Sequence, residues 1–394
     1  MHPADDTARA APRDSADDKD EARGSILVDR ELAAALGTAL RATPGAPPIG
    51  RDQVQPASVD LRLGPTAVRI RAGFLPGTTP VEERLRALAT SSLSLAGEGA
   101  VLERGLVYLV QLEEELELPE GVRGRFNPRS STGRCDVFTR VLCPGHPRFD
   151  EVPAGYRGKL WLEIAPLSFP VRLRRGDRLC QIRLQRGRAG LTTDELRAVY
   201  AEAPLLFIGD RPLPLDEARF DDDGGLELSV GLAGRDPAGW RASAHTDVLD
   251  FSGERAHARD DYWEPVRASG GGCILAPGSF YIFASRERIR VPPHLAAEML
   301  PVDVGIGELR NNYAGFFDNG FGWREDSAGR PSGNGTPAVL EVRAHDVPFL
   351  VEDGQVFFRL RFFRTSGRPD RLYAEGRAGD SYRDQDLTLA RVFR

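Results

Sequence analysis

The sequence is poor in cysteine and methionine and has no long apolar run. Only 4 of its 394 residues are cysteine and 2 are methionine. No apolar stretch approaches the roughly 18 residues that a transmembrane helix needs. The cysteines are spread along the chain without a C-x-x-C pair, which argues against a disulfide framework and a structural zinc site. They are Cys135, Cys143, Cys180 and Cys273. These absences favour a soluble protein of the reducing cytoplasm, with no membrane partner.

A basic excess is also missing. The chain has 52 Lys and Arg against 58 Asp and Glu, and its formal net charge is −6. A broad nucleic-acid-binding surface normally carries excess positive charge, so nucleic acid is excluded as a general partner. A local arginine cluster can still bind a nucleotide. Residues 1–24 lack bulky apolar side chains and are predicted to be a disordered tail, without the features of a secretory signal or a transit peptide.

Short alternating patterns, punctuated by glycine and proline, fill most of the remaining chain. Residues 58–63 alternate as in a half-buried strand, and a turn is expected at Gly64 and Pro65. Residues 101–122 have the pattern of a hairpin. The expected fold class is therefore mainly β, with many short strands.

Helical patterns are few. One short helix is expected to start near Asp29, which is a plausible N-cap. A second is expected in residues 192–205, with Thr192 or Thr193 as its cap.

The second half of the chain repeats the first. Residues 101–119 align without gaps on residues 274–292, and residues 160–184 align on residues 338–362, which places Glu163 opposite Glu341. Two ordered blocks in register indicate two tandem copies of one β domain. The predicted divisions are a disordered tail at 1–24, a first copy at 25–187, a helical linker at 188–210, a second copy at 211–375 and a C-terminal tail at 376–394.

The segment NPRSSTGR, residues 127–134, concentrates groups that bind anions. Guanidinium groups, hydroxyls and a glycine that permits close backbone approach can together hold a phosphate. The groups come from Arg129, Ser130, Ser131, Thr132, Gly133 and Arg134. A polar surface turn is the plain alternative. The aligned segment of the second copy, LPVDVGIG, has neither arginine nor serine, so the repeated scaffold does not require these side chains.

Glu163 is the only acid in the apolar segment LWLEIA. A buried carboxylate is costly unless it serves a purpose, and with a raised pKa it can act as a general base and acid. Strand alternation offers the alternative that Glu163 shares a solvent-facing side with Trp161. Zinc deaminases carry H-x-E and C-x-x-C motifs, which are absent here. A serine nucleophile near His146 would lack the G-x-S-x-G elbow.

Four ordered motifs carry a family resemblance. VQPASVDLRLG, RSSTGR, GYRGKLWLEI and the segment P-x-x-L-x-x-G-D-x-x-x-Q ending at Gln181 resemble the dCTP deaminase and dUTPase superfamily. ILVDREL at residues 26–32 favours the deaminase branch. The resemblance covers residues 25–187 well and 211–365 weakly, and the length matches the long tandem form of dCTP deaminase.

The resemblance implies two tandem dUTPase-like domains, each a distorted β-barrel or jelly roll. It implies hydrolytic deamination of dCTP to dUTP and ammonia without zinc, with Mg²⁺ bound through the substrate triphosphate. It further implies a trimer-based homo-oligomer with nucleotide sites between neighbouring subunits, and dTTP as a possible feedback inhibitor.

The resemblance also assigns roles to residues. Glu163 matches the family's catalytic general base, and Ser130 and Arg134 match the residues that position the attacking water and orient the glutamate. The matching substrate contacts are Arg129 and Ser131 at the phosphates, with Thr132 and Gly133 in the same motif, Tyr156 and Asp150 at the sugar, and Gln181 along the cleft.

One departure from the family pattern concerns the sugar site. The family's aspartate position falls on Pro153, so Asp150 fits only if the loop carries an insertion. The second copy keeps the family spacing with Asp318, Gly320 and Phe321. We therefore hypothesise that a site forms between unlike copies, with the arginines of the first copy facing a strand of the second.

Three alternatives stay open from the sequence. The chain could be a dUTPase, a bifunctional dCTP deaminase and dUTP diphosphatase, or a non-catalytic nucleotide-binding regulator. The C-terminal region around Ser381, Tyr382 and Gln385 is expected to be a frayed polar end unless it folds over the site.

Overall fold

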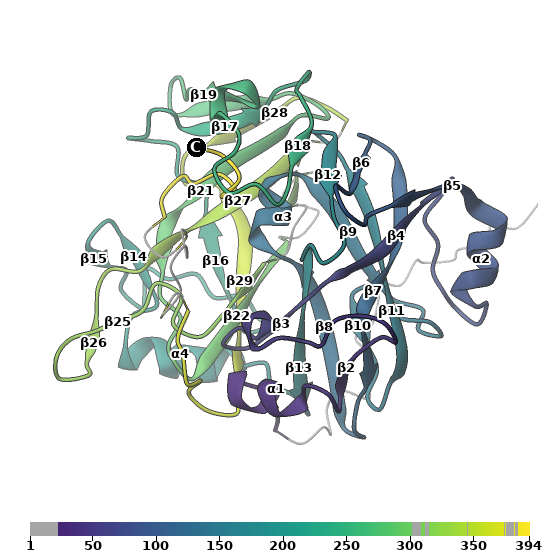
Figure 1. Cartoon of the computed structure of the whole chain (residues 1–394). Coiled ribbons are helices and arrows are strands. Elements are labelled where there is room, and N and C mark those ends of the chain that lie inside the picture. The colour runs from purple at the N-terminus through teal and green to yellow at the C-terminus, as the bar shows by residue number, and fades with distance from the viewer. Residues whose placement is uncertain are drawn as a thin grey trace, which may run out of the picture.

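The computed structural model describes residues 23–301, 309–311, 315–344, 346–373, 375, 382 and 385–394, without the side chains of 309–311. The tail predicted at residues 1–24 therefore lies almost wholly outside the described residues. The first copy occupies the purple-to-teal side of Figure 1 and the second copy the green-to-yellow side.

The first copy is built from two antiparallel sheets. One has the order β1-β13-β8-β10, with β3 beside β13, and the other has the order β5-β4-β7-β11-β9, with β2 beside β7. The strands of the first sheet are β1 Ser25–Ile26, β3 Val59–Leu61, β8 Val122–Pro128, β10 Glu151–Val152 and β13 Cys180–Arg186. Those of the second are β2 Leu40–Ala42, β4 Leu63–Ile70, β5 Ala89–Ser94, β7 Val107–Glu117, β9 Val137–Leu142 and β11 Arg157–Pro166.

The second copy has the same plan. One sheet has the order β16-β29-β22-β24, and the other β15-β14-β21-β17-β19, with β27 beside β21 and β23 beside β27. The strands of the first are β16 Gly225–Ser229, β22 Leu295–Pro301, β24 Phe316–Phe317 and β29 Val356–Arg364. Those of the second are β14 Leu206–Ile208, β15 Arg211–Pro212, β17 Gly239–Ala242, β19 Trp263–Val266, β21 Phe280–Ile289, β23 Leu309–Asn311 and β27 Thr336–Ala344.

The remaining described strands form small sheets. A three-stranded sheet has the order β18-β12-β6, and two pairs are β20 with β28 and β25 with β26. Their bounds are β6 Ala100–Leu102, β12 Val171–Leu173, β18 Leu249–Asp250, β20 Gly272–Leu275, β25 Arg324–Glu325, β26 Pro331–Ser332 and β28 Phe349–Glu352. Because β18 comes from the second half and pairs with β12 of the first, the two halves share a sheet as well as a covalent link.

The described helices are short. The α-helices are α1 Asp29–Ala35, α2 Val81–Leu88, α3 Ser130–Arg134 and α4 Thr193–Glu202, and the 3₁₀ turns are η2 Arg51–Gln53 and η3 Arg259–Asp261. α4 begins as predicted, with Thr192 and Glu195 forming a capping box. Its Leu196 and Tyr200 are buried in the core of the second copy, so this helix packs as part of that copy. The division of the chain into domains stays a prediction.

The register of the strands repeats between the copies. Glu163 of β11 lies opposite Leu109 of β7, and Glu341 of β27 lies opposite Ile282 of β21. Leu109 and Ile282 are aligned in the repeated sequence, so the same positions pair in both copies. The glycine that opens each pairing, Gly105 or Gly278, has φ of 76° or 70°, which side chains other than glycine rarely adopt.

Two local expectations were wrong. No turn interrupts the chain at Gly64 and Pro65, because β4 runs through both residues and absorbs them in a register shift against β7 between Leu63 and Ala67. Residues 101–122 do not form a hairpin either. β6 pairs with β12, and β7 pairs with β2, β4 and β11.

The C-terminal end is not frayed in the part of the tail that the structure describes. Phe393 packs edge to face against Phe169 and Trp263, with ring centroids 6.5 and 5.8 Å apart. Leu389 and Val392 are buried in the same cluster, which joins the core of the first copy. Residues 385–394 therefore form a fixed segment between the copies, which we call the C-terminal segment.

Candidate active site

The arginine- and serine-rich motif folds into one helical turn. Strand β8 ends at Pro128, and α3 follows at Ser130–Arg134. The Arg129 backbone N–H donates to the Leu179 carbonyl, and the Thr132 hydroxyl donates to the same oxygen at 2.8 Å. Thr132 is fully buried and anchors α3 to the segment before β13. The Thr132 hydroxyl is thus already hydrogen-bonded to the protein backbone.

Glu341 belongs to β27 of the second copy and lies against α3 of the first. Strand β27 and helix α3 lie side by side near the centre of Figure 1. A Cβ atom placed on Gly133 would be 2.7 Å from a Glu341 carboxylate oxygen, closer than real Cβ contacts. A larger residue at position 133 would therefore displace the Glu341 carboxyl group from its place against the helix.

The Glu341 carboxyl group is strongly perturbed. Its pKa is raised to about 8, mainly by burial; the charge of Arg134 partly offsets this rise, and the charge of Asp136 adds to it. A carboxyl group with a pKa near neutrality can both accept and donate a proton under physiological conditions. Because strong perturbations gather at functional sites, Glu341 is a candidate for acid–base chemistry.

Both copies line one small cavity at this point. It encloses about 50 Å³. The first copy contributes Pro128, Arg129, Ser130 and Arg134, and later residues contribute Met299, Gly315, Phe316, Phe317, Phe321, Val339, Glu341, Tyr373 and Gln385. The arrangement hypothesised from the sequence, with first-copy arginines facing a second-copy strand, is thus present within one chain.

The C-terminal segment holds Arg134. The guanidinium group donates to the Gln385 side-chain oxygen at 2.6 Å and to the Thr388 carbonyl at 2.9 Å. The Tyr382 ring lies 4.0 Å from the guanidinium carbon, and its hydroxyl is 3.2 Å from that of Ser131. Gln385 also donates to the Pro337 carbonyl of β27 at 2.9 Å, so it joins Arg134 to the strand that carries Glu341.

Arg129 and Gln181 have partners within the first copy. Arg129 lies 3.3 Å from the buried Asp60 carboxylate, with 23% of its side chain exposed. Gln181 accepts a hydrogen bond from the Ser58 hydroxyl at 2.9 Å. Arg129 keeps one face toward the cavity, whereas Gln181 does not line it.

Glu163 is placed elsewhere. It is 2% exposed and pairs with Arg140 of the neighbouring strand at 2.5 Å. The backbone at Gly73 covers its other oxygen, because a Cβ atom there would approach to 2.3 Å. The expectation of a shared face with Trp161 is confirmed, but that face is buried rather than wet. Within one chain Glu163 does not line the cavity of Ser130 and Arg134.

Asp150 and Tyr156 lie on the side of Glu163. Asp150 accepts a hydrogen bond from the Val141 backbone at 2.8 Å, and burial raises its pKa to about 7. The Tyr156 hydroxyl donates to the Lys159 carbonyl at 2.7 Å, and its ring lines a separate cavity with Trp161. The structure thus brings together only part of the predicted set: Arg129, Ser130, Gly133 and Arg134 meet Glu341 rather than Glu163.

The sugar motif of the second copy lies beside the cavity. Phe321 lines it and meets Phe317 edge to face, with ring centroids 4.8 Å apart. Asp318 is buried and accepts a hydrogen bond from Arg183 of the first copy at 3.0 Å. Arg183 also donates to the Ala297 carbonyl and stacks on Phe316, so this pair fastens the two copies together.

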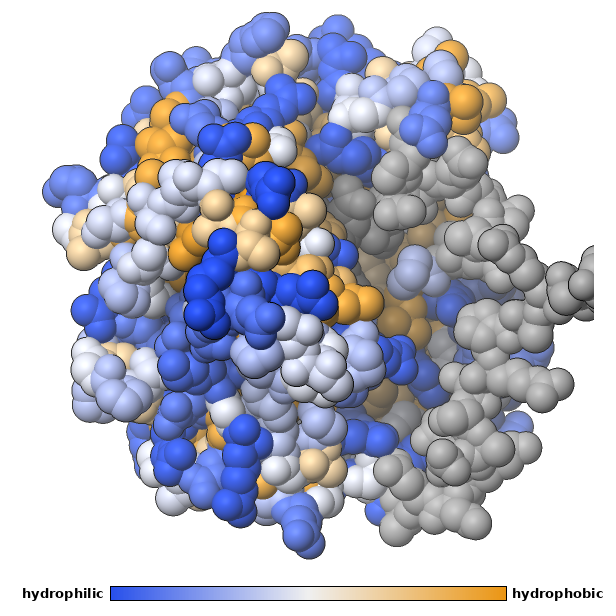
Figure 2. Space-filling model, turned by 90° about the vertical axis from the view of Figure 1, so that its right-hand side faces the viewer, coloured by the Kyte–Doolittle hydropathy of each residue, from blue (hydrophilic) through white to orange (hydrophobic). Residues whose placement is uncertain are grey.

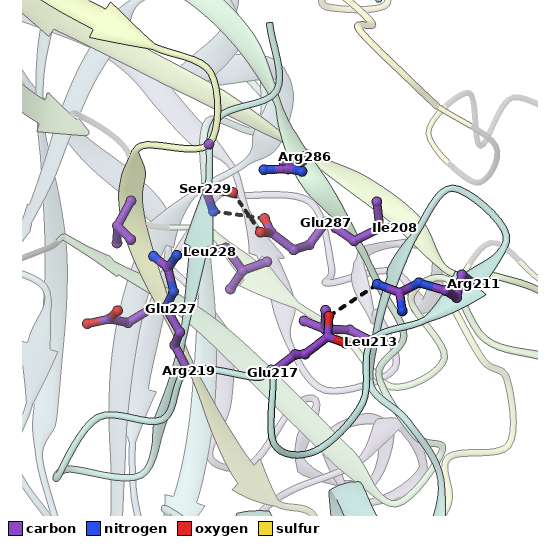
Figure 3. A pocket seen from close by; sticks show the side chains of 12 residues that line it. Ile208, Arg211, Leu213, Glu217, Arg219, Glu227, Leu228, Ser229, Arg286 and Glu287 are labelled. Atoms are coloured by element: carbon purple, nitrogen blue, oxygen red, sulfur yellow. Dashed lines mark hydrogen bonds and ion pairs between the residues drawn. The ribbon is translucent and has the colours of Figure 1, made fainter. Parts of the chain in front are cut away.

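A second depression, of about 240 Å³, lies within the second copy (Figure 3). Within it Arg211 bonds to Glu217 at 3.1 Å, and the Ser229 hydroxyl donates to Glu287 at 2.6 Å. In the first copy the residue equivalent to Ser229 is Arg62, whose guanidinium bonds to Glu114. The serine is the smaller side chain, so this position carries less side-chain volume in the second copy.

Within the described part of the chain, no three His, Cys, Asp or Glu side chains converge to hold a metal ion. The four cysteines are buried free thiols. None of the described helices is long and apolar enough to cross a membrane.

Comparison with known proteins shows the family. Residues 25–188 match the 2'-deoxycytidine 5'-triphosphate deaminase (DCD) N-terminal domain, and residues 193–393 match the 2'-deoxycytidine 5'-triphosphate deaminase (DCD) C-terminal domain. The chain belongs to the dCTP deaminase family.

The names of individual relatives point to the same family. The chain is 31% identical over 136 residues to a dCTP deaminase, dUMP-forming, of Coprothermobacter proteolyticus, a match that covers 34% of this chain and 69% of the relative. It is 33% identical over 132 residues to a dCTP deaminase of Halorubrum lacusprofundi, covering 33% and 62%. The crystal structure of 2'-deoxycytidine 5'-triphosphate deaminase from Agrobacterium tumefaciens matches with a TM-score of 0.78 and 41% identity, over 89% of this chain and 100% of that one. The predicted family, fold class and enzyme class are confirmed.

Proposed function

We propose that this chain deaminates dCTP to dUTP and ammonia at the cavity between its two copies, with Glu341 as the general base and acid. The observation that carries the proposal is the buried Glu341 carboxyl group, with a pKa of about 8, packed against Gly133 and facing Arg134. Family membership supplies the substrate.

The proposed chemistry uses one carboxyl group twice. Glu341 takes a proton from water as the water oxygen attacks C4 of the cytosine ring. The same carboxyl group then gives the proton to the amino nitrogen, which leaves as ammonia when the C4–N bond breaks, and the second water proton ends on ring nitrogen N3 as the C4 carbonyl forms. Ser130 positions the water, and Arg134 orients the carboxylate while its charge keeps part of the group ionised.

Arg129 is proposed to bind the triphosphate, because part of its guanidinium group reaches the cavity and arginine matches phosphate geometry. The cavity of about 50 Å³ is far smaller than the roughly 300 Å³ or more of ordinary ligand sites. Binding of dCTP therefore has to displace lining side chains.

Glu163 remains the alternative base. Its pairing with Arg140 and the cover at Gly73 count against it, since both oppose approach of a substrate. The resemblance favours it only through its sequence motif. A contact between Glu163 and another chain of an oligomer would keep this alternative open.

Matched substitutions separate the two acids. Glu341→Gln should lower kcat for ammonia release from dCTP by about 10²–10⁴-fold, because a positioned acid–base group contributes that much. Glu163→Gln has the same change of charge and shape and should keep most of the activity. The opposite pattern would transfer the role to Glu163. Absence of ammonia release by the unaltered protein would overturn the proposal.

A second candidate activity is direct formation of dUMP, which the names of several relatives specify for those proteins. Product analysis with dCTP distinguishes dUTP from dUMP and diphosphate. Incubation with dUTP tests whether the triphosphate is cleaved without deamination. Release of dUTP alone would exclude the dUMP-forming reaction.

We further propose that Mg²⁺ enters with the substrate triphosphate and that no zinc takes part. A trimer-based homo-oligomer, dTTP as feedback inhibitor and a cytoplasmic location complete the proposal. The buried free thiols suit a reducing compartment. Mass measurement in solution, metal analysis of active protein and dTTP titration test these points separately.

A further inference from the structure

A basic depression of about 660 Å³ lies outside the site described above. It opens between residues 254–259 and the C-terminal segment. The lining residues are Trp240, Glu254, Arg255, Arg259, Leu387, Thr388, Leu389, Ala390, Arg391, Phe393 and Arg394. Four guanidinium groups thus face one side-chain carboxylate, in a protein whose net charge is negative.

Two of these guanidinium groups have no charged partner. Arg259 bonds to Asp260 at 2.8 Å, and Arg391 lies 3.9 Å from Glu254. Among the described residues, the side chains of Arg255 and Arg394 make no hydrogen bond or ion pair. Uncompensated positive charge in a concave surface attracts anions.

The backbone at Arg255 is held in an unusual conformation. Its φ is 50°, a left-handed conformation that is uncommon for a residue other than glycine, asparagine or aspartate. Its N–H donates to the Arg391 carbonyl at 2.9 Å, which fixes this conformation against the C-terminal segment. Such a fixed conformation brings Arg255 to the rim that Arg391 and Arg394 also line.

We propose that this depression binds the phosphate chain of a small polyphosphorylated anion. Its volume is in the range of about 300–1,000 Å³ that is usual for small-molecule sites. Guanidinium groups pair with phosphate through two parallel hydrogen bonds, which suits several phosphoryl groups in sequence. The limited volume of the depression and the negative charge of the whole protein favour a small ligand over a nucleic acid.

The site is connected to Arg134 by the C-terminal segment. Thr388 lines the depression, and its carbonyl accepts the hydrogen bond from Arg134. A ligand that draws Arg391 and Arg394 together shifts the backbone between them and Thr388. Ligand binding in the depression therefore weakens the hydrogen bond between Arg134 and the Thr388 carbonyl and lowers kcat. This coupling rests on the proposed function, whereas the binding itself does not.

Binding is tested with inorganic triphosphate by titration calorimetry. The Arg129→Ala variant serves as the background, because it removes the proposed phosphate contact of the active site. We expect a remaining site in this background, weakened at least about tenfold when Arg255→Asn and Arg394→Ala are added. Asparagine tolerates the left-handed conformation, so the change removes charge with little strain.

Arg267→Ala is the matched control, since it removes an arginine that is 80% exposed outside the depression. It should leave triphosphate binding unchanged. Equal binding in the Arg255→Asn, Arg394→Ala protein, or no binding in the Arg129→Ala background, would overturn the site. Repeating the titration with dTTP and with inorganic phosphate shows whether the nucleoside or the phosphate chain length governs affinity.

Coupling is tested by kinetics with dCTP. Inorganic triphosphate should lower kcat in the unaltered protein, and only raise KM, by competition, in the Arg255→Asn, Arg394→Ala protein. A change in KM alone in both proteins refutes the coupling. A protein that releases no ammonia from dCTP refutes the proposed function instead, and leaves the calorimetric result valid.

Discussion

Replacing Glu341 by glutamine should stabilise the protein while removing its activity. Burial raises the pKa of this carboxyl group from 4.5 to about 8 in the folded chain. The folded protein therefore prefers the protonated form, and ionisation costs stability. With respect to this group, stability is greatest below pH 4.5 and is lost as the pH rises to about 8. Glutamine has a similar shape and never ionises.

The size of the effect follows from the same pKa values. The difference between 4.5 and about 8, at roughly 1.4 kcal/mol per pKa unit, corresponds to an upper limit of about 5 kcal/mol. The advantage of glutamine should be about 1 kcal/mol near pH 5 and approach that limit near pH 9. A partial rearrangement around the ionised group would reduce the figure but not its sign.

Denaturant unfolding of the two proteins across this pH range measures the prediction. The difference in midpoint should grow with pH and level off above about pH 8. Glu163→Gln is the control with the opposite sign, because it weakens the buried ion pair with Arg140 and should cost about 1.5–3 kcal/mol. If the stability of the Glu341→Gln protein relative to the unaltered one does not depend on pH, the raised pKa is refuted.

Two further predictions concern the junction between the copies. Gly133→Ala should abolish most activity with the fold retained, because the new methyl group would lie 2.7 Å from the Glu341 carboxylate and displace that carboxyl group; kcat with unchanged secondary structure checks this, and normal turnover would contradict it. Arg183→Met should destabilise the protein by about 3–5 kcal/mol, because it leaves the buried Asp318 without its cross-copy partner. Thermal unfolding measures this cost, and an unchanged midpoint would show that the pair does not fasten the copies.

Much of the fold was predictable because its signals are local. The cap at Thr192, the alternation of short strands and the aligned blocks around Tyr108 and Tyr281 all appear in the structure as expected. The two tyrosines even repeat one contact, each accepting a hydrogen bond from a backbone N–H five residues earlier. The turn expected at Pro65 was wrong, because a register shift between β4 and β7 accommodates the proline within the strand.

The site was harder to predict because its parts are distant in sequence. Alternation along β11 places Trp161 and Glu163 on one face but cannot show what covers that face; Gly73 and Arg140 do so here. The partner of Arg134 depends on how the two copies dock. The only sequence signal was that each copy keeps one motif that the other lacks: the first keeps the arginine- and serine-rich motif, and the second keeps the family spacing of the sugar motif. Tyr382 and Gln385 lie in a polar segment whose composition does not distinguish a loose end from a fixed one.

The junction of α3 with β27 has a consequence for how this protein can change. In an assembly of identical single domains, one substitution enters every interface at once, so the acid and the arginine of a site share a single gene copy. Here Arg134 and Glu341 belong to different halves of one chain. Under the proposed assignment of Glu341 as the general base, Glu163 and its partner Arg140 can change without altering the pair of Arg134 and Glu341. Under that assignment, the two-copy chain separates two constraints that a single domain has to satisfy together.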